Sequence, residues 1–141
     1  MNIDDILKEI EADSVIDRLN LDSAALSTPR LHAKYLNILS VEKSTLRRLQ
    51  DTHDKLIKDT FEYYTGKSSA AVYKNKPFNL KILKGDLDTY INADEDIISS
   101  KSQIDEQNTK IYIIQEMIKG LHQRSFMIKN AIDWIKHLDG N

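Results

Sequence analysis

The chain has no cysteine, only two prolines and four glycines, and no long hydrophobic run among its 141 residues. Without cysteine there can be no disulfide, no cysteine-liganded zinc and no thiol nucleophile. The apolar runs are too short for a transmembrane helix, and the acidic start MNIDDILKEIEAD is unlike a basic targeting peptide. Because 40% of the residues are hydrophobic and 30% are charged, we expect a soluble, folded protein with no membrane contact. Its length favours a single domain, or two small helical pieces that share a core.

The scarcity of helix breakers predicts an all-α protein. Residues 30–65 and 86–119 contain neither proline nor glycine, so each stretch can form one long helix. Residues 3–11 add a short amphipathic helix, with apolar side chains at three- and four-residue spacing and Asn2 placed to cap the first turn. The predicted fold therefore has two long helices plus a short N-terminal helix.

The ends of the two long helices carry sequence signals. Thr28 followed by Pro29 is typical of an N-cap and a first helical residue, and Gly66 is a typical C-terminal stop. Asn92, with Glu95 three residues later, forms a capping-box pattern for the second long helix. The chain is therefore divided into N-terminal helices, a basic Gly/Pro-containing connector and a C-terminal helix, at residues 1–66, 67–91 and 92–138.

Both long helices carry an apolar stripe. In the first, the stripe runs from Tyr35 to Tyr63, and Glu42, His53 and Thr60 interrupt it. A histidine in such a stripe is expected to be held by a hydrogen bond. The second helix has more apolar surface toward its C-terminus than one partner helix can cover, so we predict that this part is buried between subunits of a homo-oligomer. The predicted contact residues are Ile118, Leu121, Ile128, Ile132, Trp134 and Ile135.

Residues 63–85 form a basic segment with five lysines and no acidic residue, in a chain whose net charge is -2. Four aromatic residues lie among these lysines. Because lysines can follow phosphates and aromatic faces can stack bases, the segment favours single-stranded nucleic acid as a ligand. The predicted DNA-binding residues, two of them lysines on the preceding helix, are Lys55, Lys58, Tyr64, Lys67, Lys74, Lys76, Lys81 and Lys84. The alternative is that Tyr63, Tyr64 and Phe78 pack the connector onto the helices while the lysines are only solvated.

No catalytic, cofactor or metal motif is complete. The GKS tripeptide at 66–68 lacks the first glycine of a phosphate-binding loop, because Phe61 occupies that position. The acidic cluster that begins at Asp86 has Ile97 where a calcium loop needs its terminal glutamate. The four histidines form no HExxH motif and no pair one turn apart. We therefore expect a protein without enzymatic activity, cofactor or bound metal.

Several stretches of the chain together resemble one narrow family. KDTFEYYTGK at 58–67, the AAVYKNKPFNLKILK stretch after it, and HQRSFMIKNAIDWIKHLDG at 122–140 are similar to the UvsY family of recombination mediators from T-even-like bacteriophages. The acidic N-terminal helix, the SVID, TPRLHAKYL and YINADEDI stretches and the total length agree as well. The resemblance therefore covers essentially the whole chain.

The resemblance implies a function without catalysis. Members of the UvsY family bind single-stranded DNA, form homo-oligomeric rings, and help the phage recombinase UvsX load onto DNA that is occupied by the phage single-stranded-DNA-binding protein. By this resemblance the chain would form a hexamer or heptamer ring in the cytoplasm of the infected bacterial host. The alternative is a structural helical oligomer, such as a virion or scaffold component, without a specific role on DNA.

The family also suggests where DNA binds. Its DNA-binding role is attached to the pattern K-x-basic-aromatic-D/E-Y-Y-[ST]-G-basic at the end of the long helix. Lys58 and Lys67 match the first and last basic positions of this pattern. Thr60 departs from the middle one, so we expect the connector lysines to carry more of the binding. The family's oligomerisation region is C-terminal, in agreement with the apolar residues from Leu121 to Leu138.

Overall fold

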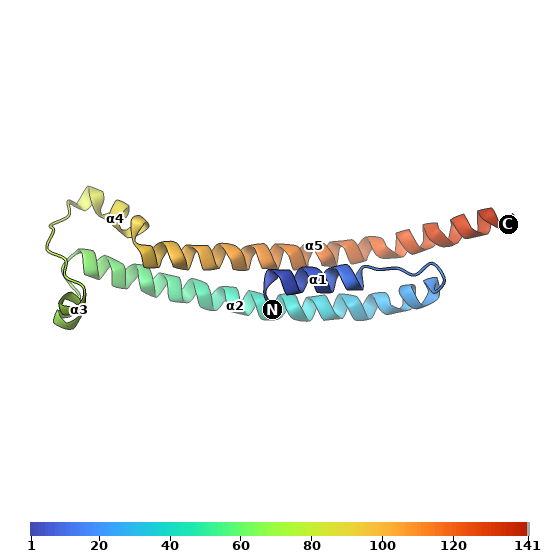
Figure 1. The fold of residues 1–141 in the computed structure, drawn as a ribbon, viewed down its shortest axis with the longest axis horizontal. Helices are drawn as coiled ribbons and strands as arrows, with labels where there is room; N and C mark the ends of the chain where they lie inside the picture. The colour runs from blue at the N-terminus through green and yellow to red at the C-terminus, as the bar shows by residue number, and fades with distance from the viewer. Residues whose placement is uncertain (141) are drawn as a thin grey trace. The chain divides into compact units, whose positions relative to one another are not determined.

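The computed structural model describes residues 1–140, which form helices joined by turns and contain no β-strand (Figure 1). The predicted all-α class is therefore confirmed. The elements are α1 (Ile3–Asp13), α2 (Leu21–Tyr64), α3 (Ala70–Asn75), the 3-10 turn η1 (Lys84–Asp86), α4 (Leu87–Ala93) and α5 (Glu95–Leu138). Within residues 1–140, none of the helices is long and apolar enough to cross a membrane.

The chain divides into two compact units, which are described separately. Unit 1 comprises Met1–Lys43 and Asn108–Asn141, and unit 2 comprises Ser44–Gln107. Both α2 and α5 contribute residues to each unit. The predicted basic connector, residues 67–91, lies in unit 2 and is partly helical, because it contains α3, η1 and most of α4.

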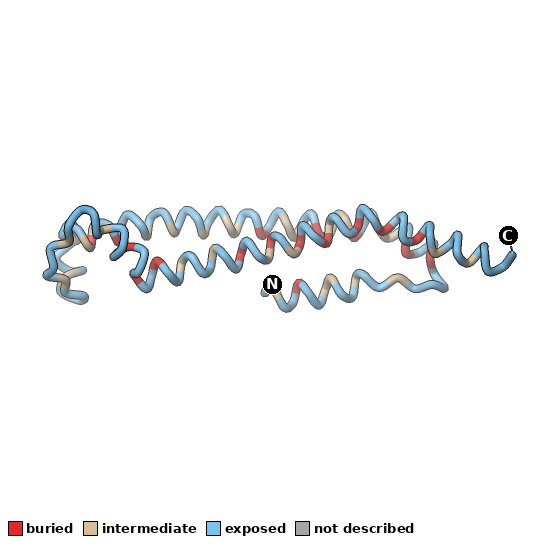
Figure 2. Tube along the Cα trace, turned by 90° about the horizontal axis from the view of Figure 1, so that it is seen from above, coloured by how far each residue is buried: buried red, intermediate tan, exposed pale blue. Residues whose placement is uncertain are grey.

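The core of unit 1 is built by α1, the first half of α2 and the second half of α5. Figure 2 shows buried residues recurring along α2 and α5. Ile6 of α1, Tyr35 of α2 and Ile114 of α5 are almost fully buried and belong to one cluster. A second cluster joins Leu21 of α2 to Ile128 of α5. The apolar stripes predicted for the long helices thus serve the chain's own core in this unit.

The N-terminal helix begins as predicted, because the side-chain oxygen of Asn2 accepts the Asp5 N–H at 2.8 Å. It extends to Asp13, whose carboxylate accepts hydrogen bonds from the Lys34 ammonium at 2.6 Å and from the Tyr35 hydroxyl at 2.7 Å. Burial alone would raise the pKa of Asp13, but these two hydrogen bonds outweigh it and lower the pKa below its usual value. The Asp13 carboxylate therefore ties α1 to α2 as a charged group.

The predicted start of the first long helix at Pro29 is wrong. α2 begins at Leu21, and Pro29 lies inside it. The Thr28 hydroxyl does not cap a helix start but donates to the Ala24 carbonyl one turn earlier, at 3.1 Å. The turns before the proline are stabilised because Leu21 and Ala24 are buried against Ile128. Tertiary packing here outweighs the local proline signal.

The predicted stop at Gly66 is confirmed. α2 ends at Tyr64, and Gly66 has a positive φ of 78°, which glycine adopts without strain. The Lys67 N–H donates to the Glu62 carbonyl at 2.8 Å, and the Gly66 N–H donates to the Tyr63 carbonyl at 3.4 Å. These two hydrogen bonds form a Schellman motif, which satisfies carbonyls at the end of the helix and turns the chain into the connector.

The capping residue of the second long helix is Asp94 rather than the predicted Asn92. α5 begins at Glu95, and the Asp94 carboxylate accepts the Asp96 N–H at 3.0 Å. Asn92 instead belongs to the short helix α4, and its side-chain oxygen accepts from the Lys101 ammonium at 3.3 Å. The difference arises because the backbone of Asp94 is extended and separates α4 from α5. A capping-box pattern in a sequence does not reveal such a break.

Candidate nucleic-acid interface

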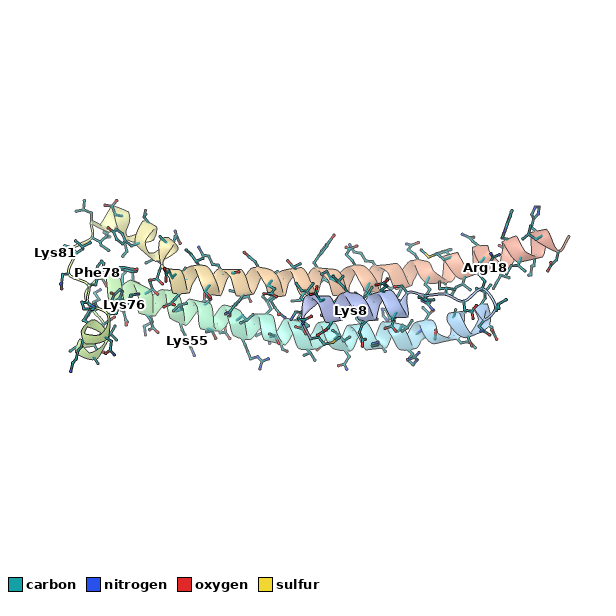
Figure 3. All side chains as sticks on the ribbon, viewed as in Figure 1. Lys8, Arg18, Lys55, Lys76, Phe78 and Lys81 are labelled. Atoms are coloured by element: carbon teal, nitrogen blue, oxygen red, sulfur yellow. The ribbon has the colours of Figure 1, made fainter. Side chains whose placement is uncertain are left out.

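Seven lysines of the predicted interface lie in unit 2, and all seven are exposed. They come from the end of α2, from α3 and from the connector; Figure 3 labels one of them on α2 and two on the connector. Five of them lie in residues 63–85, which include no acidic side chain, so the positive charge is concentrated there, whereas Lys55 and Lys58 lie among acidic residues of α2. Such a charge attracts a phosphate backbone. The seven residues are Lys55, Lys58, Lys67, Lys74, Lys76, Lys81 and Lys84.

At the end of α2 the family's basic positions differ in their access to a ligand. The Lys58 side chain is 74% exposed and pairs with Glu62 one turn later, at a distance of 4.0 Å. A pair this exposed holds the ammonium group only weakly. Thr60, which departs from the family's middle basic position, is only 7% exposed. Lys58 and Lys67 are therefore open to a ligand, whereas the side chain at position 60 packs inside unit 2.

Tyr63 organises the aromatic residues of this region. It is buried, and its ring centroid lies 5.5 Å from that of Tyr73 and 5.4 Å from that of Phe78. The Tyr73 hydroxyl donates to the Tyr63 carbonyl at 2.7 Å, and the Tyr63 hydroxyl donates to the Lys76 carbonyl at 3.1 Å. These contacts hold α3 and the connector on the end of α2. Tyr63 is therefore a packing residue, which is one of the two roles considered for it from the sequence.

Tyr64 is half-buried, and its ring contacts those of Phe78 and Tyr90. Its hydroxyl donates to the Asp94 carboxylate at 2.8 Å. Burial, together with this hydrogen bond, raises the pKa of Tyr64 to about 12. The side chain is thus held at both its ring and its hydroxyl, and its predicted role in DNA binding remains a prediction.

An open groove of about 550 Å³ lies beside these aromatic residues in unit 2. Its lining is aromatic, apolar and basic, and includes Phe61, Tyr64, Phe78, Leu80, Lys81 and Lys84. Phe61 is 39% exposed, and the Lys67 ammonium lies 5.4 Å from the centroid of its ring. Phe61 occupies the aromatic position of the family's pattern, but no pattern in the sequence points to Leu80 or shows that the two residues line one groove.

The described part of the chain, residues 1–140, contains no group of three or more His, Asp or Glu side chains that could hold a metal ion. His53, which interrupts the stripe of α2, has its Nδ1 atom 2.9 Å from the Ser100 hydroxyl of α5. The hydrogen bond predicted for this histidine is therefore confirmed. What the region offers a ligand is lysine charge and aromatic surface.

The residues predicted for subunit contacts on α5 separate into groups with different exposure. Leu121 and Ile128 are only 4% and 3% exposed and belong to the core of unit 1. Ile132 and Trp134 are exposed. Ile118 and Ile135 are half-buried, and each packs against one of the two core clusters of unit 1. Leu121 and Ile128 are thus already buried within the chain, and the assembly role of all six residues remains a prediction.

One family of known proteins is similar to the chain along nearly its whole length. The sequence profile of "Recombination, repair and ssDNA binding protein UvsY" matches residues 9–141. A relative, recombination protein uvsY of Enterobacteria phage T4, is 22% identical over 133 residues, which are 94% of each chain. A crystal structure of the bacteriophage T4 recombination mediator protein UvsY (lattice type II) has a TM-score of 0.84 at 21% identity, covering 100% of this chain and 99% of the other. Another (lattice type I) has a TM-score of 0.83 at 22% identity, with coverages of 94% and 98%.

Proposed function

Because the chain belongs to the UvsY family of recombination, repair and single-stranded-DNA-binding proteins, we propose that it is a phage recombination mediator that binds single-stranded DNA. The resemblance noted in the sequence is confirmed by the family match. In this proposal the protein promotes loading of the phage recombinase UvsX onto DNA covered by the phage single-stranded-DNA-binding protein, in homologous recombination and DNA repair. It performs no catalysis of its own and acts in the cytoplasm of the infected bacterial host.

The exposed lysines of unit 2 carry the proposal. Seven ammonium groups reach solvent from a segment and a helix end that also present aromatic residues. Lysine contacts a phosphate as a point charge and an aromatic face accepts any base, so binding should be nearly independent of DNA sequence. A flexible single strand can bring both its phosphates and its bases to such a surface, whereas a duplex keeps its bases stacked. We therefore expect single strands to be preferred over duplex.

The proposal includes self-assembly into a homo-oligomeric ring. Trp134 and Leu138 on the last turns of α5 are 55% and 62% exposed, and Phe126 and Met127 on the same half of this helix are exposed as well. We assign subunit contacts to the C-terminal helix, residues 92–138, and DNA contacts to the end of the N-terminal helices, residues 1–66, and to the basic connector, residues 67–91. A ring would place several copies of the lysine surface along one strand and so increase the overall affinity.

Fluorescence anisotropy with a labelled oligo(dT) strand tests the DNA-binding part of the proposal. The wild-type protein should bind the strand, binding should weaken as salt rises, and unlabelled duplex should compete poorly at equal nucleotide concentration. A helical protein that assembles in solution but does not bind the strand, even at low salt, would instead support the alternative of a structural oligomer without a DNA role.

The loading role needs its own measurement. The DNA-dependent ATPase of UvsX should start with a long lag on single strands that are already covered by the single-stranded-DNA-binding protein, and the chain should shorten this lag. A variant with weakened DNA binding should shorten it less. An unchanged lag in the presence of the wild-type chain, under conditions where the chain binds DNA, would contradict the mediator function but not the DNA binding.

A further inference from the structure

Two phenylalanines line the groove beside the end of α2. Phe61 lines it and is 39% exposed, and Phe78 is half-buried in its lining. At Gly66 an added Cβ would meet no atom within 4 Å, so this part of the lining is open. The volume of about 550 Å³ lies within the range of small-molecule sites, about 300–1,000 Å³. A planar ring can therefore enter the groove without a rearrangement of the backbone.

The same groove has a basic rim. Lys81 and Lys84 line it, and the Lys67 ammonium lies over the ring of Phe61, 5.4 Å from its centroid. Among the described residues that line the groove there is no acidic side chain. Aromatic surface beside several ammonium groups favours a ligand that is both planar and anionic, because such a ligand satisfies the stacking surface and the charge together.

The connector adds exposed apolar surface where simple solvation would not need it. Leu80 is 64% exposed and lines the groove, although it lies between lysines in a segment that faces water. Leu80 shares the lining with Phe61 and Phe78, and apolar surface that is grouped in one groove and rimmed by charge is typical of a ligand site. The edge of a ring bound against Phe61 would cover it.

We propose that this groove takes one nucleobase of a bound single strand, which stacks on Phe61 while the flanking phosphates contact Lys81 and Lys84. The inference rests on the proposed single-strand binding and adds that bases, not phosphates alone, supply affinity. An acidic peptide with an aromatic side chain is the competing ligand. The nucleic acid is favoured because exposed lysines continue beyond the groove to Lys58 and Lys55 on α2, as a long polyanion requires.

The test compares two labelled strands of equal length, oligo(dT) and an abasic strand with the same phosphates but no bases. The full-length wild-type protein should bind the abasic strand more weakly. Phe61→Ala should weaken binding of oligo(dT) by about 5- to 150-fold, the range of base–aromatic stacking, and should leave binding of the abasic strand unchanged. The salt dependence should stay the same for both strands, because no phosphate contact is removed.

Two further variants distinguish loss of the base contact from loss of folding. Leu80→Ser changes a side chain that is 64% exposed, so the protein should keep its helical circular dichroism while its preference for oligo(dT) over the abasic strand decreases. Tyr112→Ala removes an aromatic side chain that is 61% exposed on α5 outside the groove, and it should retain the wild-type preference.

Each of the following results would contradict a nucleobase site in the groove, and they can be told apart. Equal binding of both strands by the wild-type protein, or equal weakening of both by Phe61→Ala, would leave DNA binding intact but remove the base site. If neither strand binds, the proposed function itself fails. An acidic, aromatic peptide that binds in a Phe61-dependent way, while both strands bind equally, would make the groove a peptide site.

Discussion

The Tyr64 hydroxyl donates a 2.8 Å hydrogen bond to the carboxylate of Asp94, which joins the last residue of α2 to the residue that caps α5. Asp94 is only 7% exposed, and its other carboxylate oxygen accepts the Asp96 N–H. Both oxygens of this buried side chain are thus engaged. The hydrogen bond between Tyr64 and Asp94 therefore joins the two ends of the segment that carries the connector lysines.

Replacing Tyr64 with Phe should lower the free energy of unfolding by about 1.5 kcal/mol, because a hydrogen bond to a charged group is lost while the ring remains. Urea denaturation at neutral pH measures this change. DNA affinity should stay at the wild-type value. The reverse result, unchanged stability with weaker DNA binding, would show that the hydroxyl contacts the ligand rather than Asp94.

The same residue should make stability depend on alkaline pH. The pKa of Tyr64 is about 12 in the folded chain, against a usual value of 10.0, so the unfolded chain loses this proton first. The stabilisation is therefore complete below about pH 10 and is lost as the pH rises from about 10 to about 12. The difference in unfolding free energy between the wild-type protein and Tyr64→Phe should shrink over this interval.

Helix caps and stops that depend on neighbouring residues can be predicted from the sequence, whereas helix ends that depend on packing against distant residues cannot. The Asn2 cap and the Gly66 stop follow from the chemistry of one turn, and both are present. The predicted start of α2 is wrong because Pro29 gives a strong local signal, whereas the burial of Leu21 depends on Ile128, which lies more than a hundred positions later in the chain. Composition predicts the charge and aromatic content of the interface, but only the fold reveals its groove.

Changing Lys58 and Lys67 to Ala should weaken binding to single strands and flatten the log–log salt dependence by up to about 1.4 per engaged subunit, at ~0.7 per single-strand phosphate contact. Both side chains are exposed, so helicity and the solution mass should not change. Anisotropy titrations at several salt concentrations measure the slope. Wild-type affinity and slope in the double variant would place the DNA path elsewhere on the protein.

Lys119→Ala is the matched control for these substitutions. Its side chain is 74% exposed, the same as that of Lys58, and it also pairs with a glutamate on its own helix, Glu116, at 3.2 Å. It lies in unit 1, outside the basic segment. We expect Lys119→Ala to keep both the affinity and the salt dependence of the wild-type protein.

The ion pair between Glu42 and Lys110 should be important for stability, because it is nearly buried. The two charged groups are 3.6 Å apart, and their side chains are only 10% and 15% exposed. Lys110→Met should lower the free energy of unfolding by about 2 kcal/mol, since Glu42 then loses its ion pair with the lysine in poorly solvated surroundings. Adding Glu42→Leu should restore most of the loss, whereas Lys119→Met, in the exposed pair, should cost less than ~0.5 kcal/mol.

Acid should destabilise unit 1 through Asp13. Hydrogen bonds from Lys34 and Tyr35 hold the pKa of Asp13 below its usual 3.8, despite its burial, so the unfolded chain binds this proton first. The stabilisation is present above about pH 3.8 and is lost as the pH falls through the lower folded value. Asp13→Asn should be less stable than the wild-type protein at neutral pH, with the difference shrinking in acid. A constant difference across this range would contradict the assignment.

Assembly should depend on the exposed end of α5 rather than on its whole apolar seam. Trp134 and Leu138 are more than half exposed, so their replacement by Glu should leave the fold of the subunit intact while it disrupts a contact that buries them. Light scattering should then show a smaller particle with unchanged helical circular dichroism. Ile128→Glu should behave differently, because Ile128 is 3% exposed and a charge there must unfold part of unit 1. The native mass in the Trp134→Glu/Leu138→Glu variant would place the subunit interface on another face of the molecule.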